Sequence, residues 1–138
     1  MSSAAIVLDA NILIRAVLGK RVRELIQAHA TTVKFFAPDV AYADARKYLP
    51  ALLTKRGVDP IPAMLVLDAL ERIVHPVDMD VYGGLQQQAL LRIEMRDADD
   101  WPVLACAMVL GCPVWTEDAD FFGTGVATWT TDRIALFL

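Results

Sequence analysis

The sequence predicts an α/β fold in which a parallel β-sheet is flanked by helices. Short apolar segments recur along the chain, and segments with helical periodicity lie between them. Strands that alternate with helices in this way favour a parallel sheet with right-handed crossovers. The segment 6–8, Ile-Val-Leu, is apolar at every position, which is typical of a strand buried on both faces of such a sheet.

The first half of the chain contains two expected strands and four expected helices. Apolar residues after Asp9 recur on one helical face, and Gly19 ends that pattern. Pro38 suits the first turn of the helix that follows the second strand. In order, the elements are a strand over 6–8, a helix up to Gly19, a helix over 20–30, a strand over 33–37, and helices over 39–55 and 63–72.

The second half adds three expected strands and two expected helices. Asp78 is expected to cap a helix whose apolar residues recur every four positions, at Val81, Leu85, Ala89 and Ile93. Pro102 marks the first turn of a later apolar helix, and Gly111 marks its end. The strands are expected over 73–77, 112–116 and 126–129, before a short closing segment over 132–138.

The length and composition favour one domain, residues 1–138, with a well-filled core. Of 138 residues, 56% are hydrophobic, and a chain of this size buries roughly two-thirds of its unfolded surface. No apolar run approaches the roughly 20 residues that span a bilayer, and residues 1–5 lack the basic start of a secretion signal. We therefore expect a cytoplasmic protein with no membrane partner, in which Cys106 and Cys112 are reduced core thiols.

The charge balance is acidic and uneven. The net charge is −4, which argues against a protein that coats nucleic acid through a broadly basic surface. Of the 17 acidic residues, 13 are aspartates. Five of them fall within the 24 positions 97–120, at Asp97, Asp99, Asp100, Asp118 and Asp120. Such a cluster is either a solvated face or a cation site, and composition alone leaves both open.

Four aspartates are expected to converge at one edge of the sheet. Asp9 directly follows the first strand, and Asp118 follows the fourth strand by two residues. Asp100 begins the helix before that strand, and Asp44 lies about one turn into the helix after the second strand. Because the carboxyl ends of parallel strands share one edge, where ligands bind in open α/β sheets, these side chains could meet in one crevice.

Bringing several carboxylates together is costly without a cation. Two unit charges about 4 Å apart repel by roughly 4 kcal/mol at an effective dielectric constant of about 20. All-oxygen ligands favour Mg²⁺ or Mn²⁺, and such ions support phosphodiester hydrolysis. Each acid also has a purely structural interpretation. Asp9 and Asp100 could cap helices, Asp44 could pair with Lys47, and Asp118 could form a turn.

Four segments together resemble the PIN-domain ribonucleases, which include the VapC-type toxins of toxin–antitoxin pairs. They are Leu-Asp-Ala-Asn at 8–11, Pro-Asp-Val-Ala-Tyr-Ala-Asp at 38–44, Asp-Trp-Pro-Val-Leu-Ala-Cys-Ala at 100–107, and Val-Trp-Thr-Glu-Asp-Ala-Asp-Phe at 114–121. The segments span nearly the whole chain in the family's order. The resemblance implies a three-layer sandwich with about five parallel strands, and an enzyme that cleaves RNA with Mg²⁺ or Mn²⁺.

The resemblance also implies roles for individual residues. Asp9, Asp44, Asp100 and Asp118 match the four acidic catalytic positions, and the implied metal ligands are Asp9, Asp100, Asp118 and Asp97. Asn11 would support the pocket by hydrogen bonding, Thr116 would orient the loop of Asp118, and Asp120 is an accessory candidate. The second acid is usually a glutamate, so the shorter Asp44 would reach a metal only through water. Asp97, Asp99 and Asp100 all remain candidates for the direct ligand, with Asp100 favoured.

Partners follow from the same resemblance. Candidate RNA contacts are Arg15, Lys20, Arg21 and Arg23, although a solvated surface explains these residues equally well. A toxin of this kind would form a homodimer and would bind a cognate antitoxin that masks the site. The high apolar content is compatible with such interfaces.

Two other classes of function are alternatives to a ribonuclease. A phosphatase of the haloacid-dehalogenase type also places an aspartate at the first strand tip, but it needs a second aspartate where this chain has Asn11. A signalling receiver needs a lysine at a strand tip near its acids, and no lysine is placed so. A PIN-like scaffold that binds partners without cleaving RNA remains the alternative.

Overall fold

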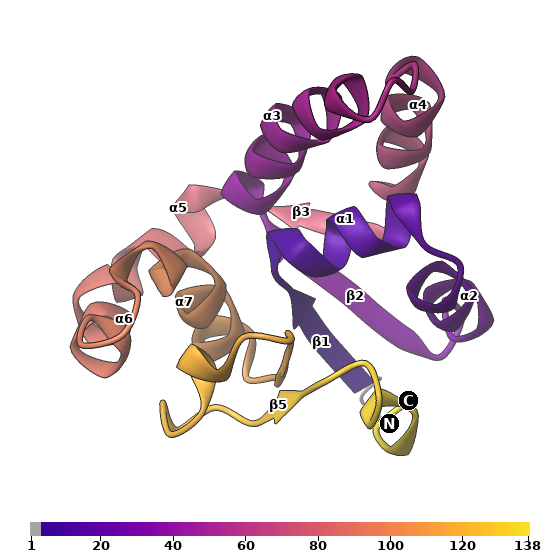
Figure 1. Ribbon diagram of the computed structural model, residues 1–138. Helices are drawn as coiled ribbons and strands as arrows, with labels where there is room; N and C mark the ends of the chain where they lie inside the picture. The colour runs from indigo at the N-terminus through magenta and orange to yellow at the C-terminus, as the bar shows by residue number, and fades with distance from the viewer. Residues whose placement is uncertain (1–3) are drawn as a thin grey trace.

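Five parallel strands form one sheet between two layers of helices in the computed structural model, which describes residues 4–138 (Figure 1). The strand order is β3-β2-β1-β4-β5, and every neighbouring pair is parallel. The expected α/β class and three-layer arrangement are therefore confirmed. The expectation of no secretion signal falls partly on residues 1–3, which lie outside the described residues. The strands are β1 (Ala4–Leu8), β2 (Val33–Pro38), β3 (Val74–Val77), β4 (Val114–Trp115) and β5 (Thr128–Trp129).

The central strand β1 is buried on both faces, which explains its unbroken apolar sequence. Ile6 and Leu8 belong to one hydrophobic core, whereas Val7 belongs to the core on the opposite face. All three side chains are fully buried. Because side chains alternate between the faces of a strand, a segment covered on both sides has no position for a polar residue.

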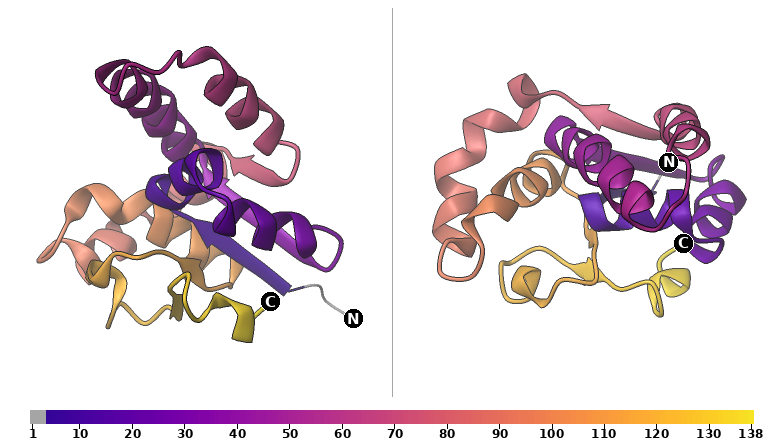
Figure 2. Two further views of the ribbon diagram at one scale, coloured as in Figure 1. Left: turned by 45° about the vertical axis from the view of Figure 1, so that its right-hand side comes forward. Right: turned by 45° about the horizontal axis from the view of Figure 1, so that its top comes forward.

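The first layer contains four helices that cover one face of β1 and β2. They are α1 (Ala10–Leu18), α2 (Arg21–Ala28), α3 (Asp39–Lys55) and α4 (Ile61–Leu70). The helix α1 contacts the other three, and its buried residues Ile12, Leu13, Ala16 and Val17 are those of the expected apolar face. In both views of Figure 2, these four helices lie apart from the helices that follow β3 in the chain.

The second layer contains α5 (Met79–Tyr82), α6 (Gln86–Ile93) and α7 (Trp101–Leu110). The helix α7 packs against β1, β2 and β4, and it is buried along most of its length. It begins with proline in its first turn and ends at Gly111, whose φ of 65° is left-handed, as the sequence predicted. Burial all round explains why this helix carries no charged residue.

The prediction of a single helix after Asp78 is wrong, because the helix is interrupted at two consecutive glycines, Gly83 and Gly84. A short 3-10 turn, Gly83–Leu85, separates α5 from α6. Glycine is a poor helix former, and the tighter turn rotates the following helix relative to the first. The expected apolar stripe is therefore split, and Val81 is 50% exposed while its neighbour Tyr82 is buried.

Asp78 occupies the N-cap position of α5, but its side chain makes no capping hydrogen bond. The backbone N–H of Met79 instead donates to Asp39 Oδ2 at 3.2 Å, and the Tyr82 hydroxyl donates to Asp39 Oδ1. Asp39 begins α3, so this carboxylate ties the two helix layers together at the end of β2. Capping from a distant segment leaves no signal in the local sequence.

The two strands near the C-terminus are shorter than the expected ranges 112–116 and 126–129. The N–H of Cys112 donates to Ala107 O at 3.1 Å and so closes the end of α7. Pro113 has no N–H to donate to a neighbouring strand. Only Val114 and Trp115 therefore remain in β4.

Both cysteines are free, as expected. Cys106 is buried, and burial raises the pKa of the half-buried Cys112 to about 11, so this thiol is neutral near pH 7. No helix within residues 4–138 is long and apolar enough to cross a membrane.

The strand order creates a switch point between β1 and β4. From β1 the chain proceeds to β2 and β3 on one side, and it later returns to β4 and β5 on the other side. Ligands in open α/β sheets bind outside the carboxyl ends of the strands at such a point. The residues that follow Leu8 and Trp115 therefore lie where such a sheet would bind a ligand.

Candidate acidic active site

Asp9 lies at the carboxyl end of β1 and is almost completely buried, with 6% exposure. The N–H of Ile12 donates to Asp9 Oδ1 at 2.9 Å, so the carboxylate caps α1. The Thr116 hydroxyl donates to the other oxygen, Oδ2. Burial raises the pKa of Asp9, although these two hydrogen bonds oppose that effect. The capping role and a site role are therefore compatible in one residue.

Thr116 links Asp9 to the loop that follows β4. Its hydroxyl oxygen accepts a hydrogen bond from the N–H of Asp118 at 2.9 Å. Asp118 Oδ1 in turn accepts from the N–H of Asp120 at 2.9 Å. This chain of bonds positions the two loop carboxyl groups relative to the buried carboxylate of Asp9. Thr116 itself is fully buried.

Asp100 is a second acid whose environment disfavours its charged form. It lies at the start of α7 and is half-buried. Its Oδ2 atom is buried and has no hydrogen-bond partner within residues 4–138. Burial first, and then the charges of Asp97, Asp118 and Asp9, raise the pKa of Asp100 to about 7.

The four acids that match the catalytic positions line one cavity of about 180 Å³. Asp9 follows β1, Asp44 lies in α3, Asp100 precedes α7, and Asp118 follows β4. Asp44 is the most exposed of the four. Asn11 and Asp99 line the same cavity, and the side chain of Asn11 makes no hydrogen bond to these carboxylates among the described residues.

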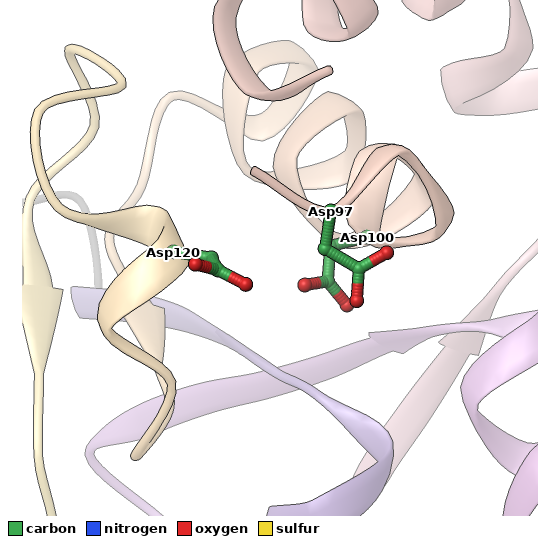
Figure 3. Close-up of side chains that lie close together, drawn as sticks. All are labelled: Asp97, Asp100 and Asp120. Atoms are coloured by element: carbon green, nitrogen blue, oxygen red, sulfur yellow. The ribbon is translucent and has the colours of Figure 1, made fainter. Parts of the chain in front are cut away.

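A second group of carboxylates lies beside this cavity and shares Asp100 with it. One ligand atom from each of Asp97, Asp100 and Asp120 lies within 4.8 Å of the others. Figure 3 shows the carboxylate of Asp120 approaching those of Asp97 and Asp100 from the opposite segment. Asp97 Oδ1 also accepts from the N–H of Asp99 at 3.0 Å, which fixes the turn before α7.

This arrangement fits a hard divalent cation. Several carboxylates are held close together, and no basic side chain neutralises them, within the part of the chain that the structure describes. Burying an unpaired carboxylate oxygen such as Asp100 Oδ2 is costly, and a cation ligated there would remove that cost. Oxygen ligands of this kind suit Mg²⁺ or Mn²⁺.

A larger hollow of about 640 Å³ adjoins the acidic cavity. Ile14 lines both, and the hollow is also lined by Arg15, Lys20 and Arg21. Arg15 is exposed, and its Nη1 lies 4.0 Å from a carboxylate oxygen of Glu117. Three of the four basic residues considered as RNA contacts therefore surround one depression next to the acids.

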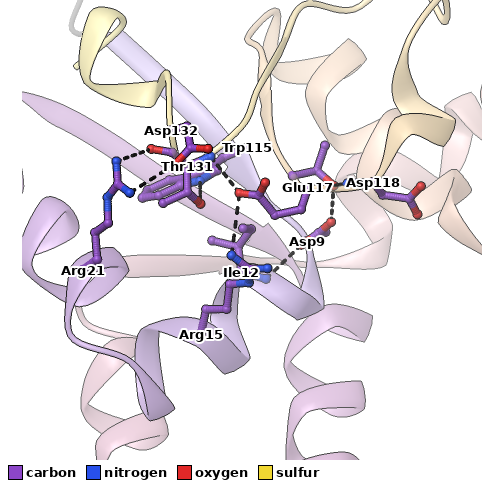
Figure 4. Close-up of polar contacts among 10 residues, drawn as sticks. Asp9, Ile12, Arg15, Arg21, Trp115, Glu117, Asp118, Thr131 and Asp132 are labelled. Carbon is purple, nitrogen blue, oxygen red and sulfur yellow. Dashed lines mark hydrogen bonds and ion pairs between the residues drawn. The ribbon is translucent and has the colours of Figure 1, made fainter.

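Arg21 and Arg23 are held by hydrogen bonds, whereas Arg15 makes only the ion pair with Glu117 at 4.0 Å among the described residues. Arg21 donates to Asp132 Oδ1 at 3.1 Å and to Thr131 O at 3.5 Å (Figure 4). Arg23 turns back to donate to Val17 O at 3.2 Å, and it does not line the hollow. Arg15 and Lys20 are the residues whose charge is most available to a ligand.

Sequence reasoning missed several residues that shape the site. Glu117 Oε1 accepts from the N–H of Thr131 at 2.7 Å, which anchors the loop after β4 on one side. Arg92 and Arg96 bind that loop on its other side. Arg92 lies in α6 and Arg96 lies in the turn that follows this helix, so no local pattern in the sequence indicates their shared role. His29 and His75 do not line the acidic cavity.

Comparison with protein families gives one match, to the PIN domain, over residues 7–138. No curated protein sequence matches the chain.

Solved structures with a similar fold include chains from VapBC and FitAcB structures. The VapBC2 complex of Rickettsia felis, bound to a DNA fragment from its promoter, contains a chain with a TM-score of 0.65 and 13% identity. The match covers 91% of this chain and 98% of that chain. The FitAcB structure from Neisseria gonorrhoeae gives a TM-score of 0.62 and 21% identity over 91% and 97% of the two chains.

A third similar structure is PAE2754 from Pyrobaculum aerophilum. Its TM-score is 0.70 at 15% identity, and the match covers 94% of this chain and 85% of that chain. At such low identities these structures establish the fold, and the chemistry has to be argued from the residues of this chain.

Proposed function

The chain belongs to the PIN-domain family, and we propose that it is an endoribonuclease that hydrolyses RNA phosphodiester bonds with Mg²⁺ or Mn²⁺. One observation carries the proposal. Asp100 has a buried oxygen that finds no hydrogen-bond partner in the described residues 4–138, in a cavity that also holds Asp9, Asp44 and Asp118. Carboxylates crowded at the switch point of a parallel sheet are suited to binding a cation and a phosphate together.

In this proposal Asp9, Asp100, Asp118 and Asp97 hold the cation. When bound, the ion supplies Lewis-acid stabilisation of the charge that develops during phosphodiester cleavage. Asp9 would present its carboxylate from a fixed position, because capping of α1 and the bond from Thr116 hold both oxygens. Asp44, which is exposed and one methylene shorter than glutamate, would act through water.

The supporting residues would act on the positions of these acids. Thr116 couples Asp9 to the backbone of Asp118, and Asp118 couples to the backbone of Asp120. A shift of this loop would therefore move both carboxyl groups together. Asn11 lines the cavity, where its amide could bond to substrate or to an ordered water.

RNA would approach along the hollow next to the acids. Arg15 and Lys20 would contact backbone phosphates there, whereas Arg21 and Arg23 would chiefly hold the protein's own structure because both have partners. With a net charge of −4, the attraction to RNA is local. Binding should consequently be modest and should weaken with salt.

The test of this function is RNA cleavage by the purified protein. We expect cleavage that requires Mg²⁺ or Mn²⁺, stops with a chelator, and falls at least about 100-fold in the Asp9→Asn variant, since a metal ligand is lost. Asp80→Asn is a matched control, because Asp80 is exposed in α5 and does not line the cavity. Equal cleavage by the wild type and Asp9→Asn would refute the assignment.

We further propose that the protein is the VapC-like toxin of a toxin–antitoxin module, acts in the cytoplasm, forms a homodimer and binds a cognate antitoxin. The support is the family and the similarity of the fold to chains in VapBC and FitAcB structures. Induced expression should arrest growth, and Asp9→Asn should relieve the arrest. Metal binding without any RNA cleavage would instead favour a PIN-like scaffold.

A further inference from the structure

The loop that carries Asp118 and Asp120 is held by Arg96, a residue outside the acidic cavity. The Arg96 guanidinium donates to Asp120 O at 3.0 Å and to Ala119 O at 3.5 Å. It also donates to Phe122 O. One side chain thus binds three backbone carbonyl oxygens within residues 119–122, and it makes no contact with a carboxylate there.

A second arginine, Arg92, holds the same loop four residues further along it. Its Nη1 donates to Thr124 O at 3.2 Å. Two glycines of the loop, Gly123 and Gly125, leave the space that the two arginine side chains occupy. A Cβ at Gly125 would lie 3.1 Å from Arg92 Nη1, and a Cβ at Gly123 would lie 3.3 Å from Arg96 Nη2. Both glycines have positive φ values, of 87° and 82°.

We infer that Arg96, assisted by Arg92, is a positioning residue that holds Asp118 and Asp120 against Asp97 and Asp100 for cation binding. The inference rests on the proposed function. Asp97 directly follows Arg96 in the chain, and the Arg96 side chain binds the backbone at Asp120. One residue therefore joins the two segments that supply the carboxylates. Asp120 reaches Asp97 and Asp100 from a segment at least 20 residues away in the chain, and the side chain of Arg96 joins the two segments.

The choice of carbonyl acceptors supports a positioning role over charge neutralisation. Carboxylates brought together repel each other, and a structural tie has to oppose that repulsion in the protein without metal. An arginine bound to the carboxylates themselves would compete with a cation for their oxygens. Arg96 instead binds the backbone beside them, which leaves the carboxylate oxygens free. All three contacts are made by a single guanidinium nitrogen, Nη1, which the long arginine side chain carries across to the loop.

The test compares Mn²⁺ affinity in the full chain, measured by titration calorimetry, for the wild type, Arg96→Gln and Arg96→Lys. We expect Arg96→Gln to bind Mn²⁺ about 10-fold to 100-fold more weakly, the range found when outer-shell partners of metal ligands are removed. Arg96→Lys should fall between the two, because its single ammonium nitrogen keeps the charge and can replace part of the contacts that Nη1 makes.

Arg46→Gln is the matched control for a purely structural loss. Arg46 also joins two segments, because it bonds Asp68 at 2.6 Å and reaches Glu71, and so ties α3 to α4 away from the acidic loop. Its loss should lower the melting temperature while leaving the Mn²⁺ affinity within about twofold, since no metal-site partner is removed. A drop in affinity confined to Arg96 variants would separate positioning from general stability.

The outcomes are distinguishable. Absence of Mn²⁺ binding by the wild type would overturn the proposed function. Binding by the wild type with equal affinity in a folded Arg96→Gln variant would overturn only the positioning role. If Arg96→Gln does not fold, Arg96→Lys and Gly123→Ala decide, because both disturb the contact of Arg96 with the loop. Wild-type affinity in both folded variants would then contradict the inference.

Discussion

Asp100 shows the energetic cost of burying an ionised carboxylate beside other carboxylates. Its pKa is raised from 3.8 to about 7 by burial and by the neighbouring carboxylates. A group with a raised pKa binds a proton in the native state at pH values where the unfolded chain has already released it. Its contribution to stability is therefore present at low pH and is lost as the pH rises toward about 7.

This linkage predicts a pH effect on the metal-free protein. The melting temperature of the wild type should fall between about pH 4 and pH 7, the interval between the unfolded and native pKa values of Asp100, and the fall should be smaller in Asp100→Asn, whose amide does not ionise. Added Mn²⁺ should restore stability most at the higher pH, because it binds the ionised form. Thermal unfolding with a chelator present measures the effect, and identical pH profiles for the two proteins would contradict it.

Thr116 is the second residue whose role can be tested alone. Thr116→Val keeps the shape of this buried side chain but removes the bonds to Asp9 and to the N–H of Asp118. We expect RNA cleavage to fall about 10-fold to 100-fold. Thr116→Ser retains the hydroxyl and should stay close to the wild type, so an equal loss in both variants would point to packing and not to hydrogen bonding.

The acids at the strand tips could be predicted from the sequence, and the contacts that hold them could not. Asp9 and Asp118 follow apolar strands, and parallel strands bring such positions to one edge. The turn that places Asp97 and Asp99 around Asp100 depends on side-chain bonds to the backbone. Arg96 binds backbone carbonyls 23 to 26 residues away, and no local pattern encodes those acceptors.

At the scale of elements, the break between α5 and α6 depends on glycine, and so does the end of α7. Gly84 and Gly111 both have open space where a Cβ would stand, but only Gly111 has a positive φ. The two positions therefore separate the effect of backbone conformation from that of packing. Alanine reduces the entropy of the unfolded chain at either position, but it is strained only at Gly111.

Opposite effects on stability are expected from these two substitutions. Gly84→Ala should stabilise the protein by about 0.4–1 kcal/mol, whereas Gly111→Ala should destabilise it by roughly 1 kcal/mol because of the left-handed backbone. A change of about 1 kcal/mol corresponds to a shift of roughly 3 °C in the melting temperature. Chemical denaturation measures the free energy of unfolding of both variants. A change of the same sign in the two would contradict the role given to the left-handed backbone at Gly111.

The order and type of most elements followed from the sequence because hydrophobic periodicity reports burial. The apolar strand 6–8 and the helix that begins at Trp101 are examples, since each has a face or a whole surface in the core. The lengths of β4 and β5 did not follow. Capping by Cys112, the missing N–H of Pro113 and the break at Gly83 each change an element's boundaries without changing its apolar pattern.

At the scale of the whole molecule, the fold gathers its charges unevenly around the switch point. The acids follow β1 and β4 or precede α7, and Arg15 and Lys20 line the neighbouring hollow. A protein with a net charge of −4 would repel RNA elsewhere on its surface. The bound cation and these two side chains would therefore direct RNA to one place on the molecule.

The central claim is that the acidic cavity is a divalent-cation site, and titration of Mn²⁺ into the wild type, Asp100→Asn and Asp80→Asn tests it most directly. We predict binding by the wild type and by Asp80→Asn with similar affinity, and binding at least about 10-fold weaker in Asp100→Asn. Undetectable Mn²⁺ binding by the folded wild type, or equal affinity in all three proteins, would contradict the claim.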